Sequence, residues 1–317
     1  MTNDLQRKLA VTQPSSIAEV DRRLPLGEEI FLDHIGHFVP DPQAASRALV
    51  RAGFAPTPPS VQFHPDGSPT GTGNVTAMLG RGYIEVLFKT ADTPLGREFD
   101  SAIARYSGIH LAAFAVADAA ESHRRLAAAG FRMRPLVEMQ RPVDTPAGPR
   151  TAAFTVARVE AGEMAEGRMQ ILTHRTEHTV WQPRWLGHPN GALSLLDLVI
   201  AVADLDEAAE RFQRFTARSA TANSFGRAIR LDRGRVQLVS ASVWHEITEL
   251  RVPALPFAAG YAVAVRSLEI AEERLQAANM TVLRHGRATL TNFPEELGIG
   301  VWIFTEKTDD LPWRRPA

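Results

Sequence analysis

Cysteine is the first thing that this chain of 317 residues lacks. Its absence excludes disulfides, thiolate zinc sites, iron–sulfur clusters and a cysteine nucleophile, so a bound metal ion must use nitrogen and oxygen ligands. An excess of charge of one sign is missing too, because 35 Lys and Arg stand against 36 Asp and Glu. Without a basic field, we expect the chain to bind neither nucleic acid nor an anionic membrane surface.

Long apolar runs and several well-known motifs are also absent. No 18 apolar residues follow one another, and the first twenty residues lack the basic start and apolar stretch of a secretory signal. The Gly-x-Ser-x-Gly elbow of serine hydrolases, the dinucleotide fingerprint and the phosphate-binding P-loop are missing. These absences predict a soluble, cytoplasmic protein whose partner is a small molecule.

What the chain does contain is one pattern repeated four times. Each copy has an apolar run, a helix-capping residue, an amphipathic stretch, a helix stop twelve residues after the cap, and further strand-like runs. Asp and Ser accept hydrogen bonds from the first turn of a helix, whereas Gly and Asn tolerate the left-handed conformation that ends one. Only Thr216 does not fit this chemistry among the pairs Asp41/Gly53, Asp118/Gly130, Asp204/Thr216 and Ser267/Asn279.

The spacing of the repeats predicts how the chain is divided. The four caps are 77, 86 and 63 residues apart, too far for a solenoid repeat of 20–50 residues. Four strand-rich units that pair into two sheets fit better. We therefore expect an arm (1–29), a first half (30–175), a linker with prolines and a turn signal (176–191), a second half (192–308) and a tail (309–317).

The first half also carries a family resemblance. The segments LDHIGHFVPD, HPDGSPTGTGN and GYIEVL, within residues 32–87, resemble the glyoxalase-like domain of the vicinal oxygen chelate superfamily. That superfamily includes glyoxalases, epimerases, extradiol dioxygenases and bleomycin-resistance proteins, built on a βαβββ module. The resemblance implies an α+β fold of four βαβββ modules, paired into two curved mixed β-sheet halves with helices outside. The second half keeps only the module pattern.

The resemblance further implies a metal site on the first and last strands of the two modules in the first half. At those positions stand His34, Glu85, His110 and Gln170, and the implied cofactor is one divalent ion, Fe, Mn, Co, Ni or Zn. Side chains two apart on a strand share a face, so His37 points away from His34 and is expected at the surface or behind the site.

The position of the second histidine depends on local strand geometry. His110 lies eight residues before its cap, whereas His34 lies seven before its own. A single-residue β-bulge would turn His110 into the site, and bulges concentrate near active sites. Without the bulge, Leu111 faces the cleft instead.

Other polar residues are candidates for contact with a substrate. The turn-rich stretch 64–74 is expected as a mobile loop over the cleft, where His64 or Asn74 meets substrate, or else as a solvated hairpin. His174 shares a face with Gln170 and is a substitute ligand or a substrate contact. The equivalent positions of the second half cannot form a metal site, so that half should cover the first cleft, form a homodimer face or hold an apolar ligand: Asp197, Gln237, Gly260 and Trp302.

The implied ligand set favours one type of reaction. Two neutral histidines, one carboxylate and one amide leave a bound dication with positive character and open positions. The ion would polarise a carbonyl while a carboxylate moves a proton, with Glu85 and Gln170 as the catalytic residues. We expect a metal-dependent isomerase or lyase acting on a small carbonyl or hydroxy substrate. An Fe(II) ring-cleaving dioxygenase and a metal-free binding or resistance protein, the latter favoured if Leu111 faces the cleft, are the alternatives.

Overall fold

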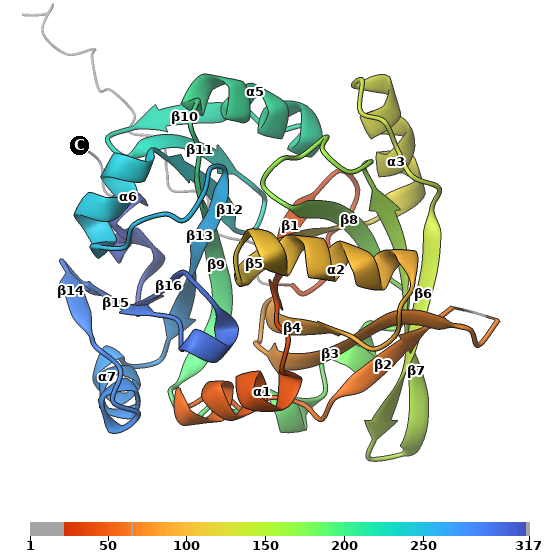
Figure 1. Cartoon of the computed structure of the whole chain (residues 1–317), viewed down its shortest axis with the longest axis horizontal. Coiled ribbons are helices and arrows are strands. Elements are labelled where there is room, and N and C mark those ends of the chain that lie inside the picture. The colour runs from red at the N-terminus through yellow and green to blue at the C-terminus, as the bar shows by residue number, and fades with distance from the viewer. Residues whose placement is uncertain (1–21, 65, 315–317) are drawn as a thin grey trace, which may run out of the picture.

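The computed structural model describes residues 22–64 and 66–314 (Figure 1). The strands form two sheets of eight, and four βαβββ modules supply them. The predicted α+β fold with two curved mixed sheets is therefore confirmed. Most of the expected N-terminal arm lies outside the described residues. In the described part of the chain, no helix combines the length and the apolar character needed to span a membrane.

The first sheet closes into a barrel in the order β1-β4-β3-β2-β6-β7-β8-β5. Its two modules meet along the antiparallel pair β1 and β5, and again where Phe63 of β2 pairs with Gln140 of β6. The elements of the first module are β1 (Ile30–Phe38), α1 (Pro42–Arg51), β2 (Ser60–Phe63), β3 (Pro69–Met78), β4 (Tyr83–Lys89) and α2 (Pro94–Arg105). Those of the second are β5 (Gly108–Val116), α3 (Ala119–Ala128), β6 (Val137–Thr145), β7 (Gly148–Arg158) and β8 (Arg168–His174).

The second sheet is open, in the order β10-β11-β12-β9-β13-β16-β15-β14. A short helix, α4 (Glu177–Val180), lies in the connection between the halves. The third module contains β9 (Ala192–Ala201), α5 (Leu205–Thr216), β10 (Ala220–Asn223), β11 (Gly226–Arg230), β12 (Arg235–Val239) and α6 (Ala241–Thr248). The fourth contains β13 (Phe257–Val265), α7 (Leu268–Ala277), β14 (Leu283–His285), β15 (Ala288–Asn292) and β16 (Val301–Thr305).

The helix caps follow the predicted chemistry. The side chains of the four predicted cap residues accept hydrogen bonds from backbone N–H groups of the first turn: Asp41, Asp118, Asp204 and Ser267. The predicted stops at Gly53, Gly130 and Asn279 have positive φ. Thr216 is the exception, because the next residue, Ala217, takes the left-handed conformation with φ 53°.

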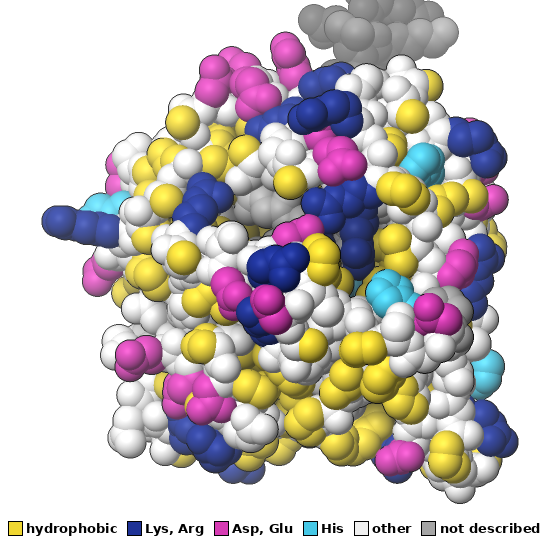
Figure 2. Space-filling model, turned by 45° about the vertical axis from the view of Figure 1, so that its right-hand side comes forward, with side chains coloured by type: hydrophobic (Ala, Val, Ile, Leu, Met, Phe, Trp, Pro, Cys, Tyr) yellow, Lys and Arg dark blue, Asp and Glu magenta, His cyan; other side chains and the backbone are white. Residues whose placement is uncertain are grey.

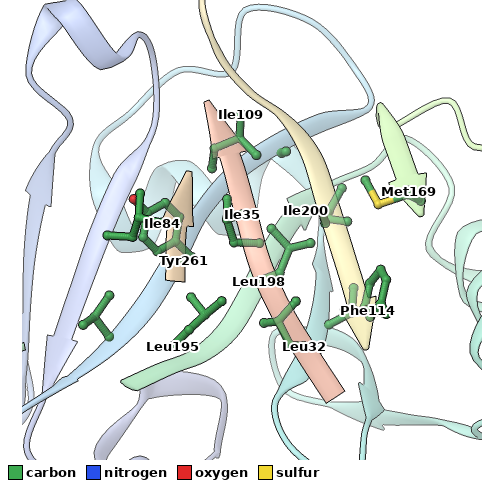
Figure 3. Close-up of a cluster of buried hydrophobic side chains, with 14 of the residues drawn as sticks. Leu32, Ile35, Ile84, Ile109, Phe114, Met169, Leu195, Leu198, Ile200 and Tyr261 are labelled. Carbon is green, nitrogen blue, oxygen red and sulfur yellow. The ribbon is translucent and has the colours of Figure 1, made fainter. Parts of the chain in front are cut away.

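One apolar core joins the two halves. Side chains from β1 and β5 meet side chains from β9 and β13, as Figure 3 shows for Ile35, Phe114, Leu198 and Tyr261, all fully buried. Full burial of such a side chain contributes roughly 1.5–3 kcal/mol. Because this face of β1 is covered by the second half, the concave face inside the barrel is left for a site.

His37 lies in this interface, which corrects the expectation of a surface position. As predicted, it points away from His34, but its side chain is fully buried. Its Nδ1 lies 2.9 Å from the carbonyl oxygen of Leu297 and its Nε2 lies 3.0 Å from the hydroxyl of Tyr261. His37 therefore connects the two halves.

Candidate functional site

A cleft occupies the interior of the barrel. Every strand of the first sheet contributes to its lining, because alternate side chains along each strand point inward. The polar residues of the lining are His34, Gln62, Thr72, Asn74, Tyr83, Glu85, Arg141, Arg158, Arg168 and Gln170. Leu87, Leu111, Val156 and Leu172 form part of its apolar wall. All lining residues come from the first half, so the second half does not cover this cleft.

His34 and Glu85 meet in the cleft, as the sequence predicts. The Nε2 atom of His34 lies 3.3 Å from a carboxylate oxygen of Glu85. The other oxygen of Glu85 accepts a hydrogen bond of 2.6 Å from the side-chain amide of Asn74. The ring of Tyr83 stacks on His34, with 4.4 Å between ring centroids. These contacts hold the imidazole and the carboxylate against each other.

Asp33 holds the other side of the imidazole and was not predicted. One of its carboxylate oxygens lies 2.8 Å from His34 Nδ1, and the other lies 2.9 Å from Nε2 of His174. The pairing of β1 with β5 skips Asp33, a bulge that lets two neighbouring side chains meet. His174 is therefore placed behind His34 rather than among the residues that line the cleft. The signal in the sequence is an acid in the apolar run FLDHIGHF.

These contacts set the charges of the network. Burial by itself would lower the pKa of His34, but the carboxylates of Glu85 and Asp33 outweigh it and raise the pKa to about 9. Burial works in the opposite direction on the carboxyls. The histidine partners nevertheless hold the pKa of Asp33 and of Glu85 below the usual range. At neutral pH the cleft therefore contains an imidazolium beside two carboxylates.

Three arginines also line the cleft, and none of them was expected there from the sequence. Arg168 forms an ion pair of 2.7 Å with Glu98. Arg158 donates a hydrogen bond of 3.2 Å to the side-chain oxygen of Gln170, and burial together with the Arg168 charge lowers its pKa to about 9. Within residues 22–64 and 66–314, neither Arg158 nor Arg141 forms an ion pair with a carboxylate. The cleft thus presents cations in excess of its own anions.

His110 does not join this group, although the bulge needed for it is present. The pairing of β1 with β5 skips His110, but Leu111 is the residue that turns into the cleft. The His110 ring stacks on Tyr106 instead, and its Nε2 lies 2.6 Å from the carbonyl oxygen of that residue. The expected place of His110 in the cleft is therefore wrong, because the extra residue of the bulge is the histidine itself.

The stretch 64–74 is mostly strand rather than a loop over the cleft. His64 is exposed at the turn between β2 and β3 and does not line the cleft. Asn74 lies within β3 and is buried. The glycines are needed for close packing, since a Cβ at Gly73 would lie 2.6 Å from the ring of Phe88. Of the two expectations for this stretch, the solvated hairpin matches the exposed turn between β2 and β3.

The donor atoms of the cleft do not fit the expected metal ion. In the described part of the chain, no three His, Asp or Glu side chains gather into a potential metal site. Leu111 occupies the place of one expected ligand, and Arg158 binds the Gln170 oxygen that would be another. His34 and Glu85 remain as two strong donors, fewer than the three protein ligands typical of a catalytic site.

The equivalent positions of the second half form no such cleft. Asp197 is fully buried and accepts a hydrogen bond of 2.7 Å from the indole of Trp313. Trp302 donates to the hydroxyl of Tyr261 at 2.6 Å. A Cβ at Gly260 would lie 2.3 Å from the carbonyl oxygen of Val301. The use of this half as a homodimer face or as an apolar ligand site stays a prediction.

Comparisons with known proteins agree with this architecture. A sequence model described as glyoxalase-like domain matches residues 32–216, so the chain belongs to this family of the vicinal oxygen chelate superfamily. No curated protein sequence matches the chain.

Solved structures share the fold at low identity. A hypothetical protein from Staphylococcus aureus has a TM-score of 0.60 and 10% identity, covering 87% of this chain and 98% of that one. A mutant of 4-hydroxymandelate synthase from Streptomyces coelicolor has a TM-score of 0.54 and 15% identity, with 87% and 92% covered. A Mn(II)-bound glyoxalase from Novosphingobium aromaticivorans has a TM-score of 0.50 and 13% identity, with 88% and 82% covered.

Proposed function

We propose that this member of the glyoxalase-like family binds the oxygen-bearing, anionic end of a small organic molecule and moves a proton on it without a metal ion. The observation that carries the proposal is that Arg141 and Arg158 line the same cleft as the His34 and Glu85 pair without forming an ion pair with a carboxylate in the described part of the chain. Guanidinium groups bind carboxylates with two hydrogen bonds in fixed geometry. In this cleft the guanidinium groups supply the positive charge. The family resemblance implies that a metal ion would supply it.

The arrangement suits isomerase or lyase chemistry. Glu85 is ionised and takes a proton from a carbon next to a carbonyl group. The electron pair of the broken C–H bond forms a carbon–carbon double bond, and the π pair of the carbonyl moves onto its oxygen. The imidazolium of His34 and the guanidinium groups stabilise the resulting oxyanion. Return of the proton to another carbon gives an isomer, whereas loss of a neighbouring leaving group completes an elimination. Asp33 holds Nδ1 of His34, which leaves Nε2 on the side of Glu85 and the cleft.

Metal-dependent isomerase, lyase or Fe(II) dioxygenase activity, expected from the resemblance, is the competing hypothesis. Metal analysis of protein purified without chelators separates the two. We expect less than a tenth of an equivalent of any divalent metal and no effect of EDTA on ligand binding. A stoichiometric metal ion whose removal abolishes ligand binding would overturn the proposal and favour the hypothesis of metal-dependent activity.

Proton transfer can be tested before the substrate is identified. A panel of 2-oxo and 2-hydroxy acids in D₂O, followed by proton NMR, should reveal deuterium exchange at the carbon next to the carbonyl for at least one member. Glu85→Gln should abolish the exchange. Arg141→Gln and Arg158→Gln should weaken binding at least tenfold, whereas Arg150→Gln, at an exposed position of β7, serves as the control. Equal behaviour of all three arginine variants would contradict the proposal.

A further inference from the structure

A second cavity lies beside the cleft, and we call it the outer cavity. It is bounded by α2 and by residues 159–167, the segment that connects β7 to β8. Its volume is about 540 Å³, whereas that of the cleft is about 50 Å³. On this measure a cavity needs about 10–15 Å³ to hold one water molecule. The cleft therefore has room for a small functional group of a few heavy atoms, and the outer cavity has room for the rest of an organic molecule.

Two side chains stand between the cavities. Arg158, the last residue of β7, and Arg168, the first of β8, line both the cleft and the outer cavity. Arg158 is 9% exposed, and besides Gln170 it contacts the sulfur of Met139 at 3.1 Å. Arg168 pairs with Glu98 of α2. Because the partition is made of long, flexible side chains rather than backbone, a rotamer change would connect the two spaces.

The outer cavity carries a surplus of positive charge. Glu98 is already shared between Arg134 and Arg168, at 2.8 and 2.7 Å. Arg105 donates to the backbone carbonyl oxygens of Ala165 and Pro256 rather than to a carboxylate. Figure 2 shows dark blue and magenta side chains together around a hollow on this side of the molecule. The charged lining has five arginines and two glutamates: Arg97, Arg105, Arg134, Arg158, Arg168, Glu98 and Glu160. Arg97 pairs with Asp92 and Arg134 also pairs with Glu160, so Arg105 and Arg158 are the lining arginines without a carboxylate ion pair among the described residues.

The side chain of His110 lines the outer cavity and not the cleft. His110 is 4% exposed and lines the outer cavity. Its Nε2 is occupied by the Tyr106 carbonyl oxygen, so Nδ1 is left as an acceptor with no hydrogen bond inside the described ranges. Phe38, Val159 and Met164 add apolar surface to the same walls. An apolar body with an anionic group and a hydroxyl would match this lining.

We propose that the outer cavity is the subsite for the body of an elongated organic anion, whose small oxygen-bearing head passes between Arg158 and Arg168 to reach His34 and Glu85. A second anionic group on that body meets the arginines of the outer cavity. The inference rests on the proposed function of the cleft. It adds the substrate class, which is an amphipathic dianion rather than a short monocarboxylate.

A series of carboxylates with one head and a growing body tests the inference. Acetate, octanoate and suberate are titrated into the full chain, and backbone amide shifts are followed by NMR. We expect octanoate to bind at least tenfold more tightly than acetate, and suberate at least threefold more tightly than octanoate. Arg105→Gln should remove the advantage of suberate over octanoate. Thermal melting of each variant verifies that it is folded.

A bulky substitution at the rim of the outer cavity provides a second test. Ser101 is an exposed residue of α2 that lines the outer cavity, so Ser101→Trp should fill it and remove the gain from the longer body. Ala104→Trp, at an exposed position of the same helix outside this lining, should behave like the unchanged chain.

The outcomes separate the two proposals. If acetate binds and Arg158→Gln weakens it, but neither a longer body nor Ser101→Trp changes affinity, the outer subsite is refuted and the function of the cleft stands. If no carboxylate shifts the amides around the cleft, both proposals fail.

Discussion

The concave faces of the two sheets are built from the same module and are filled in opposite ways. In the first half, His34 lies seven residues before its cap and faces a cleft in which Arg141 and Arg158 form no ion pair with the carboxylates that the structure describes. In the second half, Asp197 has the same spacing, and the chain's own C-terminal segment covers it. The indole of Trp313 and the guanidinium of Arg314 bind its carboxylate, at 2.7 Å from the indole and 3.0 Å from Arg314 Nε.

The difference shows what a buried charge requires. Burying a carboxylate is costly unless cations and hydrogen-bond donors compensate it. The second half meets this requirement within the chain, and Trp244 of α6 packs into the same apolar cluster as Trp313. The first half has the reverse arrangement, because the buried guanidinium group of Arg158 has no carboxylate ion pair in the described ranges. We interpret the second half as a closed version of the site and the first as an open one.

Removal of the Trp313 side chain, which covers Asp197 in the second half, should have the largest effect on stability. Trp313 is 2% exposed, and Trp313→Ala should lower the free energy of unfolding by about 3–5 kcal/mol. Urea denaturation measures this, with the half-buried Trp185→Ala as the milder control. Anion binding by the first half should be unchanged. Loss of binding would show that the two faces are not independent.

The charged network of the first half should make stability depend on pH. The pKa of His34 is raised from 6.5 to about 9, so its contribution is complete below pH 6.5 and is lost as the pH rises to 9. The pKa shift corresponds to roughly 3 kcal/mol. Asp33 and Glu85 have lowered pKa values, so their contributions are lost as the pH falls below about 4, in the acid range.

Urea denaturation between pH 5 and 10 measures the alkaline loss. Asp33→Asn should lower the pKa of His34 and reduce the loss, since one of the two carboxylates that stabilise the imidazolium is removed. A profile that is the same in this variant would contradict the charge assignment.

His37 separates packing between the halves from chemistry inside the barrel. His37→Ala leaves the Leu297 carbonyl oxygen without its imidazole partner, which should cost about 1–3 kcal/mol. Carboxylate affinity should not change, because His37 lies on the opposite face of β1 from the cleft. A tenfold change in affinity would place His37 in the functional network and would blur the distinction between the two faces.

The smallest expected effect is that of Arg158→Gln, and the corresponding change in the second half should have the opposite sign and a larger size. Arg158→Gln removes a buried cation that has no carboxylate partner in the described ranges and should raise the free energy of unfolding by about 1 kcal/mol. Arg314→Gln removes the partner of buried Asp197 and should lower it. Thermal melting of both variants checks the signs. Destabilisation by both would mean that Arg158 is structural rather than held for a ligand.

Much of the architecture could be predicted because its signals are local. The caps Asp41, Asp118 and Asp204 depend on residues within one helical turn, and the strand runs depend on alternation along the chain. Strand alternation also predicted that His34 and His37 separate, and the resemblance brought His34 together with Glu85. The prediction for His110 was wrong because of a bulge in β5, which makes Leu111 and not His110 face the cleft. A bulge shifts the register by one residue, and only pairing with β1 decides which side chain turns inward.

What the sequence by itself determined is the four-module α+β pattern and its helix ends, because periodicity and capping act over a few residues. The meeting of His34 with Glu85 was an expectation from the family resemblance. Tertiary structure alone decided the environment of that pair. Arg141 and Arg158 share a cleft with His34 and Glu85 because long-range pairing of β1 with β5 and of β2 with β6 closes the barrel. Asp33 reaches His34 through a bulge, and His174 arrives from the far end of β8. The charge of a buried site is the sum of such distant contributions, and no short segment of the sequence contains it.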